Sequence, residues 1–260
     1  MENNTKRLNL IDTIRGFTIL SMIGFHACWD IYYFNLGITY EDLSSTPFYI
    51  WQQSICWSFI LISGYCFSLG HHHLKRSALC LGGGVLITLV TGVVVNDQID
   101  IFGVLWLLGI SGFIMIVWDK LRRVLFKDNK YLTILGFWAS VFLFILFRNV
   151  NSGYLGFEGF NILRLPKGLY NGYFMTLFGF TMPGFFSSDY FSVIPWFFLY
   201  STGYYLRRIM KDGWFENKIL TLKIKPFSLI TSLGRHSFIV YVLHQVVLFA
   251  FFYVINVVID

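Results

Sequence analysis

Charged residues are scarce in this chain. Aspartate, glutamate, lysine and arginine make up 13% of its 260 residues, whereas a soluble domain carries about 25%. Hydrophobic residues make up 56%, and the mean hydropathy is +0.62. They occur in blocks of about 17 to 24 residues, the length of a helix that crosses a hydrocarbon layer about 30 Å thick. The composition excludes an ordinary soluble domain and predicts an all-α, multi-pass transmembrane helical bundle.

Several sequence landmarks are also missing. The chain has no CxxC pair and no metal-ligand spacing, so we expect its cysteines to be small buried hydrophobes and its site to use no metal. These cysteines are Cys28, Cys56, Cys66 and Cys80. No small-residue cleavage site follows the first apolar block, which we therefore expect to be retained rather than removed as a signal peptide. Because no repeat of fixed period is present, we treat residues 1–260 as one membrane-embedded domain.

The apolar blocks predict about seven spans. They cover residues 10–33, 48–70, 77–95, 101–118, 131–147, 190–206 and 237–258. Residues 171–187 are also hydrophobic but contain glycine and proline. A broken segment is tolerated at membrane depth only where protein or water surrounds it. We interpret 171–187 as a re-entrant or external segment, and an eighth span is the alternative.

The basic residues predict an orientation. On one side of the predicted membrane lie Lys6, Arg7, Lys75, Arg76, Lys120, Arg122, Arg123, Lys127, Lys130, Arg207, Arg208, Lys211, Lys218, Lys223, Lys225 and Arg235. The other side holds only Arg148, Arg164 and Lys167. By the positive-inside rule the N-terminus is cytoplasmic and the C-terminus external. This topology accounts for the net charge of +6, so a nucleic-acid partner is not indicated.

The first span carries four ionisable residues among apolar ones: Asp12, Arg15, His26 and Asp30. Ionisable groups inside a bilayer are costly and by default mark a functional site. The eleven positions from Arg15 to His26 amount to three helical turns plus about 20°, which places both side chains on one face roughly 16 Å apart. Asp30 lies one turn beyond His26.

These residue types indicate roles in transfer chemistry. His26 exchanges a proton near neutral pH, and Asp30 is placed to accept a hydrogen bond from its ring and orient it, as in triad-like sites. Arg15 keeps its charge and suits a phosphate or carboxylate group, while Asp12 at i−3 neutralises it. The alternative is that an Asp–Arg pair and a core histidine only hold helices together.

Two further sets of residues are candidates for binding. Ser237, Tyr241 and His244 form a polar seam on one face of the last span, and Gln245 adjoins it. They either line a pocket or make interhelical hydrogen bonds. The arginine pairs 122–123 and 207–208 lie on the predicted cytoplasmic side, where they either bind a nucleotide's phosphates or reflect topology alone.

Four stretches together carry a family resemblance. They are RLNLIDTIRGFTILSMIGFHACWD (7–30), FILISGYCFSLG (59–70), DYFSVIPWFFLYSTGYYLRR (189–208) and LGRHSFIVYVLHQ (233–245). The first resembles the opening of the heparan-α-glucosaminide N-acetyltransferase catalytic-domain-like family, within the transmembrane acyltransferases that modify envelope glycans. The ten residues between Arg15 and His26 look like the first-helix motif of envelope O-acyltransferases, and the closing GRHS…YVLHQ is similarly characteristic.

The resemblance implies transfer of an acyl group, in the first instance acetyl, from cytoplasmic acyl-CoA to an envelope glycan or lipid. Carried over by position, His26 is the acyl-transfer histidine and Arg15 belongs to the donor pocket. Residues 34–47 contain no histidine, so the resemblance implies the chemistry but not a heparan acceptor. Whether His26 activates the acceptor as a base or carries the acyl group itself stays open.

Two other functions compete with the acyltransferase. A transporter or permease would use the intramembrane Arg/His/Asp seam as a substrate path, although no inverted repeat is evident. A structural membrane subunit is the third alternative. The expected partners are the lipid bilayer, acyl-CoA and the acceptor. A homo-oligomer is compatible with the sequence but not specified by it.

Overall fold

The computed structural model describes residues 8–126, 129–211 and 228–259. Within them the predicted all-α class is confirmed, with one small two-stranded hairpin in addition. The chain forms two compact units. Unit 1 comprises Met1–Phe59 and Met210–Asp260, and unit 2 comprises Ile60–Ile209.

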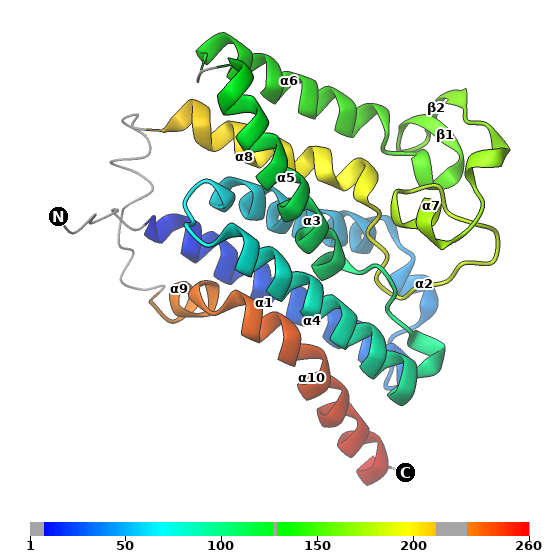
Figure 1. The fold of residues 1–260 in the computed structure, drawn as a ribbon. Helices are drawn as coiled ribbons and strands as arrows, with labels where there is room; N and C mark the ends of the chain where they lie inside the picture. The colour runs from blue at the N-terminus through cyan, green and yellow to red at the C-terminus, as the bar shows by residue number, and fades with distance from the viewer. Residues whose placement is uncertain (1–7, 127–128, 212–227, 260) are drawn as a thin grey trace. The chain divides into compact units, whose positions relative to one another are not determined.

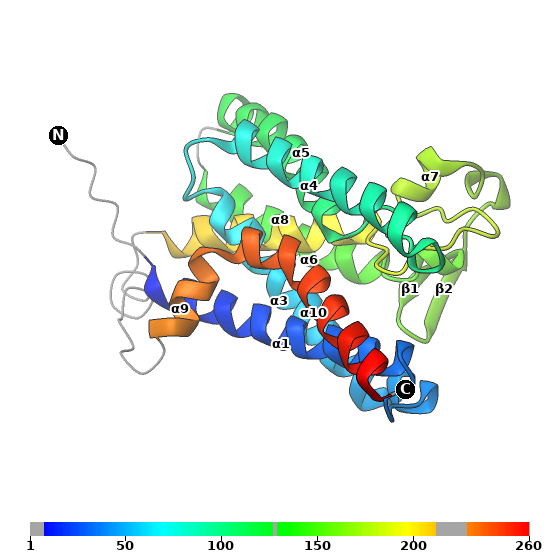
Figure 2. The ribbon, with the colours of Figure 1, turned by 90° about the horizontal axis from the view of Figure 1, so that it is seen from below.

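Unit 1 contains both ends of the chain. Its longest helix, α1 (Asn9–Tyr33), lies beside α9 (Ser228–Arg235) and α10 (Ser237–Ile259) in both views (Figures 1 and 2). The short α2 (Tyr40–Leu43) and the first part of α3 (Thr46–Phe67) follow α1 in the chain. Segments more than 200 residues apart in sequence are therefore neighbours in this unit.

Aromatic rings join α1 to α3 within unit 1. Phe25 stacks on Phe48 with ring centroids 4.6 Å apart, and the edge of Trp51 meets the same ring at 5.6 Å. The indole Nε1 of Trp51 also donates a hydrogen bond of 2.7 Å to Oγ of Ser21. This packing buries Phe25 one residue before His26 and so fixes the α1 backbone beside the candidate site.

Two glycines allow α1 and α9 to touch backbone to backbone. A Cβ on Gly16 would lie 1.9 Å from the carbonyl oxygen of Ile230, and one on Gly234 would lie 1.8 Å from that of Asp12. Real Cβ atoms do not approach that closely. Only glycine fits at these two positions, and the close crossing buries Asp12 at the end of α1.

Unit 2 consists of the rest of α3 together with α4 (His73–Val94), α5 (Val104–Phe126), α6 (Lys130–Leu146) and α8 (Val193–Met210). Helices α4 and α5 pack along one another (Figures 1 and 2). The side chains that this unit encloses completely include Ile60, Leu107, Met115 and Tyr204.

Short elements connect the helices of unit 2. They are the 3₁₀ turns η1 (Asn96–Gln98), η2 (Val150–Ser152) and η3 (Lys167–Leu169), the antiparallel strands β1 (Tyr154–Phe157) and β2 (Phe160–Arg164), and α7 (Tyr173–Leu177). Asn149 anchors the hairpin, because its Nδ2 donates hydrogen bonds to the carbonyl oxygens of Glu158 and Phe160 at 2.6 and 3.2 Å. These bonds hold the hairpin to the segment between α6 and η2.

Each predicted span lies on one long helix. Four of the described helices are long and apolar enough, by length and composition alone, to cross a membrane: His73–Val94, Val104–Leu125, Lys130–Ser152 and Ser237–Ile259. The remaining long helices α1, α3 and α8 lie outside this set, so the count of about seven spans stays a prediction. Residues 171–187 contain only the five-residue α7, far shorter than the roughly 20 residues that a spanning helix needs.

One helix extends well past its predicted end. The sequence places the end of a span at residue 118, but α5 continues to Phe126. Asp119 pairs with Arg122 at i+3 and Arg123 at i+4, and such pairs along one helix face stabilise the extra turns. Some residues used for the orientation, Lys6, Arg7, Lys127, Lys218, Lys223 and Lys225, lie outside the described residues.

Candidate active site

Helix α1 carries all four ionisable residues that the sequence singled out. Asp12 and Asp30 are buried, whereas Arg15 and His26 are half-buried. Because α1 is continuous from Asn9 to Tyr33, the rise of about 1.5 Å per residue keeps Arg15 and His26 roughly 16 Å apart. The predicted stripe therefore exists, with a basic end and a histidine end.

His26 meets a second histidine from the other end of the chain. The ring of His244 on α10 lies with its centroid 5.0 Å from that of His26, tilted by 58°. In the described part of the chain, no hydrogen bond orients the His26 ring. The sequence placed His26 and His244 in separate candidate sets, and the packing of α10 on α1 combines them.

Asp30 pairs with Gln245 rather than with His26. The amide Nε2 of Gln245 donates a 3.0 Å hydrogen bond to Oδ1 of Asp30. The expected Asp30–His26 hydrogen bond is therefore not formed, although the two residues are one turn apart on α1. The carboxylate is held by α10, which contributes His244 and Gln245 from one turn.

Three buried atoms in this cluster have no hydrogen-bond partner among the described residues: Oδ2 of Asp30, Nε2 of His244 and Oε1 of Gln245. Buried polar atoms are normally satisfied, so each unsatisfied one requires an explanation. The two oxygens are acceptors that cannot donate, which points to a ligand that supplies hydrogens.

The rest of the α10 seam is less polar than the sequence suggested. Tyr241 is buried, and its ring stacks on Phe59 at 5.9 Å. Its carbonyl oxygen lies 2.5 Å from Nδ1 of His244. Ser237 begins α10 and is half-buried, and no contact among the described residues assigns it a role. Of this seam, His244 and Gln245 meet α1's polar residues directly.

The other end of α1 holds a second polar group in unit 1. Arg15 contacts Asp12, with Nη1 and Oδ1 3.6 Å apart, and reaches the carbonyl oxygen of Gly234 at 3.4 Å. Arg235 approaches the same carboxylate, with Nε and Oδ2 3.6 Å apart, and donates to Oδ1 of Asn9 at 3.1 Å. Two guanidinium groups therefore lie beside the Asp12 carboxylate. The sequence predicted the pair with Arg15 but not the one with Arg235.

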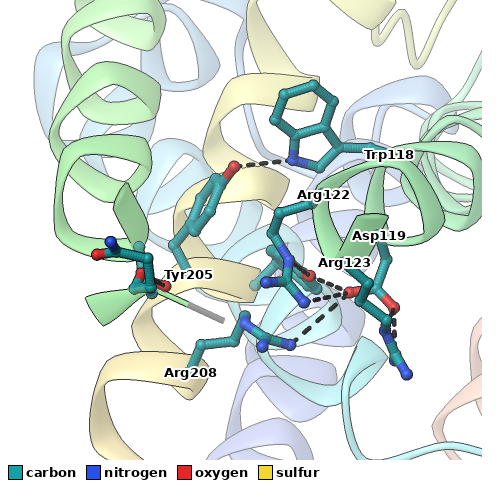
Figure 3. Close-up of polar contacts among 9 residues, drawn as sticks. Trp118, Asp119, Arg122, Arg123, Tyr205 and Arg208 are labelled. Atoms are coloured by element: carbon teal, nitrogen blue, oxygen red, sulfur yellow. Dashed lines mark hydrogen bonds and ion pairs between the residues drawn. The ribbon is translucent and has the colours of Figure 1, made fainter. Parts of the chain in front are cut away.

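Unit 2 contains a separate arginine cluster, formed by the ends of α5 and α8 (Figure 3). Asp119 lies within 3.3 Å of Nη2 of Arg122, 2.6 Å of Nη2 of Arg123 and 3.7 Å of Nη1 of Arg208. Its Oδ1 also accepts a hydrogen bond from the hydroxyl of Tyr204. Three cations therefore converge on one carboxylate.

The arginines of this cluster differ in exposure. Arg122 is buried and its Nε donates to the Tyr204 hydroxyl at 3.1 Å. Arg207 is also buried and lies over the ring of Tyr65 at 6.0 Å, while Arg123 is largely exposed. Arginines that serve topology alone need only reach water at the membrane surface, so two buried ones indicate a further role.

The sequence missed Asp119, Tyr204 and the neighbouring Trp118–Tyr205 pair, whose Nε1 and hydroxyl are 2.8 Å apart (Figure 3). The spacing of Asp119 to Arg122 and Arg123 was a usable signal, since i+3 and i+4 pairs share a helix face. No sequence signal indicated the contacts to α8, because they join residues more than 80 positions apart.

The comparisons with known proteins found one match. The family described as "heparan-alpha-glucosaminide N-acetyltransferase, catalytic" matches residues 7–246, which is most of the chain and includes every candidate site residue named above. No curated protein and no solved structure matches the chain.

Proposed function

The chain belongs to the heparan-α-glucosaminide N-acetyltransferase catalytic family, and from that membership we propose how this membrane acetyltransferase works. It takes an acyl group from cytoplasmic acyl-CoA, in the first instance acetyl-CoA. It transfers that group to a hydroxyl or amine of an envelope glycan or lipid at or beyond the outer face. His26 is the residue at which acyl transfer takes place.

The polar cluster between α1 and α10 carries this proposal. His26 on α1 meets His244 on α10, and Asp30, one turn beyond His26, pairs with Gln245, which follows His244. Ionisable side chains enclosed by predominantly apolar helices are costly to maintain and by default mark a functional site. A purely structural cluster would satisfy its own hydrogen bonds, whereas this one encloses three polar atoms that have no partner among the described residues.

The chemistry of those atoms fits the acceptor. Oδ2 of Asp30 and Oε1 of Gln245 accept hydrogen bonds and have no hydrogen to give. A hydroxyl or amine group supplies the hydrogens that both oxygens lack. A sugar, with several such groups, would satisfy them together, which supports a glycan or a glycan-bearing lipid.

We place the acyl donor's phosphates on arginines. Arg15 beside Asp12 lies about three turns from His26 on α1, a separation of the order of an extended pantetheine arm. In unit 2, Arg122, Arg123 and Arg208 gather around Asp119, and Arg207 precedes Arg208 on α8. The planar guanidinium group binds phosphate oxygens in pairs, so both groups suit the charged end of CoA.

The arrangement of unit 2 supports a cytoplasmic donor. Arg122 and Arg123 come from the C-terminal turns of α5, and Arg207 and Arg208 come from those of α8. These two helix ends meet, because Arg208 reaches Asp119 (Figure 3). Clustered arginines at one end are what the positive-inside rule predicts for the cytoplasmic face. From the distribution of basic residues along the sequence we also propose a cytoplasmic N-terminus, an external C-terminus and outward transfer.

The first prediction tests His26. Purified wild-type protein in detergent should release thiol from acetyl-CoA in the presence of envelope glycan or lipid extract, and should transfer a labelled acetyl group to the extract. His26→Ala should lower this transfer by about 100-fold or more, because proton transfer or acyl transfer at the ring is lost. His71→Ala, at an exposed histidine, is the control and should retain full activity.

Transfer that persists unchanged in His26→Ala would contradict the assignment. Wild-type protein that moves solutes across proteoliposomes without acetyl transfer would favour the transporter instead. The same labelled donor without acceptor separates the two routes: label retained on His26 indicates an acyl-histidine intermediate, and its absence indicates direct transfer. The acceptor itself would be identified as a glycan or lipid that lacks an acetyl mass in cells without the protein.

A further inference from the structure

The hydrogen bond of His244 fixes which of its ring nitrogens carries hydrogen. Nδ1 lies 2.5 Å from the carbonyl oxygen of Tyr241, one turn earlier on α10. A carbonyl oxygen can only accept, so Nδ1 is the donor and bears the hydrogen. A neutral imidazole has a single N–H, and the other nitrogen, Nε2, then presents a lone pair.

The surroundings of Nε2 indicate that the ring is neutral at rest. Nε2 is enclosed by protein and has no hydrogen-bond partner among the described residues. A protonated ring would leave a charged N–H donor buried without an acceptor, which is more costly than an unfilled lone pair. His244 is therefore held as a base with its free nitrogen enclosed in the site.

That nitrogen stands at the place where the proposed reaction occurs. The rings of His26 and His244 are 5.0 Å apart between centroids, so the two side chains meet where α1 packs against α10. Nε2 lies at the tip of the His244 ring, away from the α10 backbone to which Nδ1 is bonded. A group that reacts at His26 would therefore lie beside the His244 ring.

We propose that His244 is the general base of the transfer, an inference that rests on the function proposed above. The acceptor oxygen or nitrogen forms a bond to the acyl carbonyl carbon while Nε2 of His244 takes its proton. The bond from that carbon to its carrier breaks, and its electron pair leaves with the thioester sulfur or with the ring nitrogen of an acylated His26. The imidazolium of His244 then returns the proton to that leaving atom and becomes neutral again.

Asp30 is less suited to this task than its charge suggests. Its Oδ1 already accepts a hydrogen bond from Gln245, and it makes no hydrogen bond to His26. Because Gln245 follows His244 on the same turn of α10, the Asp30–Gln245 pair stands beside the base. Asp30 Oδ2 and Gln245 Oε1 receive the acceptor's other hydrogens and position the reacting group.

The second prediction tests whether His244 is the base by comparing an acceptor that needs a base with one that does not. His244→Asn keeps a side-chain N–H that can donate to the Tyr241 carbonyl but removes the lone pair of Nε2. Thiol release from acetyl-CoA is measured with two probe nucleophiles, glycerol and hydroxylamine. Glycerol must lose a proton as it attacks, whereas neutral hydroxylamine is nucleophilic without a base. The variant should lower transfer to glycerol by about 10²- to 10⁴-fold and transfer to hydroxylamine by no more than a few-fold.

The control is His236→Asn. His236 is exposed, and its Nδ1 makes the same kind of bond, 2.9 Å to the carbonyl oxygen of Ser232, so this variant should behave as wild type with both nucleophiles. In His244→Ala, added imidazole should restore transfer to glycerol. The rescue of His244→Ala by imidazole therefore tests the role of the base even if His244→Asn fails to fold.

Three outcomes would count against these assignments in different ways. Equal losses with both nucleophiles would mean that His244 is structural, and undiminished transfer to glycerol would mean that the base lies elsewhere. Both results overturn the inference and leave the proposed function intact. Wild-type protein that releases no thiol above the rate measured without protein, with either nucleophile, would instead overturn the proposed function itself.

Discussion

Gly16 and Gly234 stand where the backbones of α1 and α9 touch. A single methyl group at either position would force the helices apart, because the neighbouring atom is a backbone carbonyl that cannot rotate away. Asp12 and Arg15 flank Gly16 on α1, and Arg235 follows Gly234 on α9. The absence of two side chains thereby determines which charged residues can meet.

The third prediction concerns Gly16→Ala. The added Cβ would lie 1.9 Å from the carbonyl oxygen of Ile230, and relieving such overpacking costs about 1–3 kcal/mol of unfolding free energy. The unfolding temperature in detergent, followed by tryptophan fluorescence, should fall by several degrees. Gly82→Ala is the matched control, since Gly82 is also helical and nothing lies within 4 Å of its Cβ position. A Gly16→Ala variant as stable as Gly82→Ala would refute this account of the crossing.

At the scale of the helix, α5 is joined to α8 by one carboxylate. Asp119 contacts Arg122 and Arg123 on its own helix and Arg208 and Tyr204 on α8. The carboxylate therefore continues α5 beyond its apolar part and attaches its last turns to α8. Arg122 is buried by the same arrangement, so its charge depends on a nearby anion.

The fourth prediction compares the buried and the solvent-exposed ion pairs of this cluster. Asp119→Asn should destabilise the protein by about 3 kcal/mol, because it removes the carboxylate from a buried guanidinium. Arg123→Gln should change stability by at most about 1 kcal/mol, since its ion pair is exposed to solvent. Both changes in the free energy of unfolding would be measured by denaturant-induced unfolding in detergent. Equal effects of the two substitutions would mean that burial does not govern the strength of these pairs.

At the scale of the whole molecule, the stability of the fold should depend on pH through a buried carboxyl group in a connection between helices. Asp100 lies between α4 and α5, is buried, and has an Oδ1 without a hydrogen-bond partner among the described residues. Burial, together with the nearby Asp189, raises the pKa of Asp100 above its ordinary value. The folded protein therefore holds a proton on Asp100 at pH values where the unfolded chain has lost it.

The fifth prediction follows from the sign of this shift. A carboxyl with a raised folded-state pKa contributes most to stability below its unfolded pKa of about 4. That contribution is lost as the pH rises through the interval up to the folded-state value, because the unfolded state binds fewer protons there. The unfolding temperature should therefore decrease between about pH 4 and pH 8, and Asp100→Asn should flatten this dependence. If the unfolding temperature of Asp100→Asn depended on pH as strongly as that of the wild type, other titratable groups would be responsible.

The sequence by itself predicted the long helices and placed the ionisable residues on them. Blocks of apolar residues predicted each long helix because the helical repeat and the membrane's thickness both act locally along the chain, and the Arg15–His26 stripe followed from spacing on one helix. Only the tertiary structure decided the partners. His26 meets His244, Asp30 takes Gln245 instead of His26, and Asp119 joins α5 to α8. These contacts link residues that are 80 to more than 200 positions apart, and no local pattern specifies them because they depend on how helices pack.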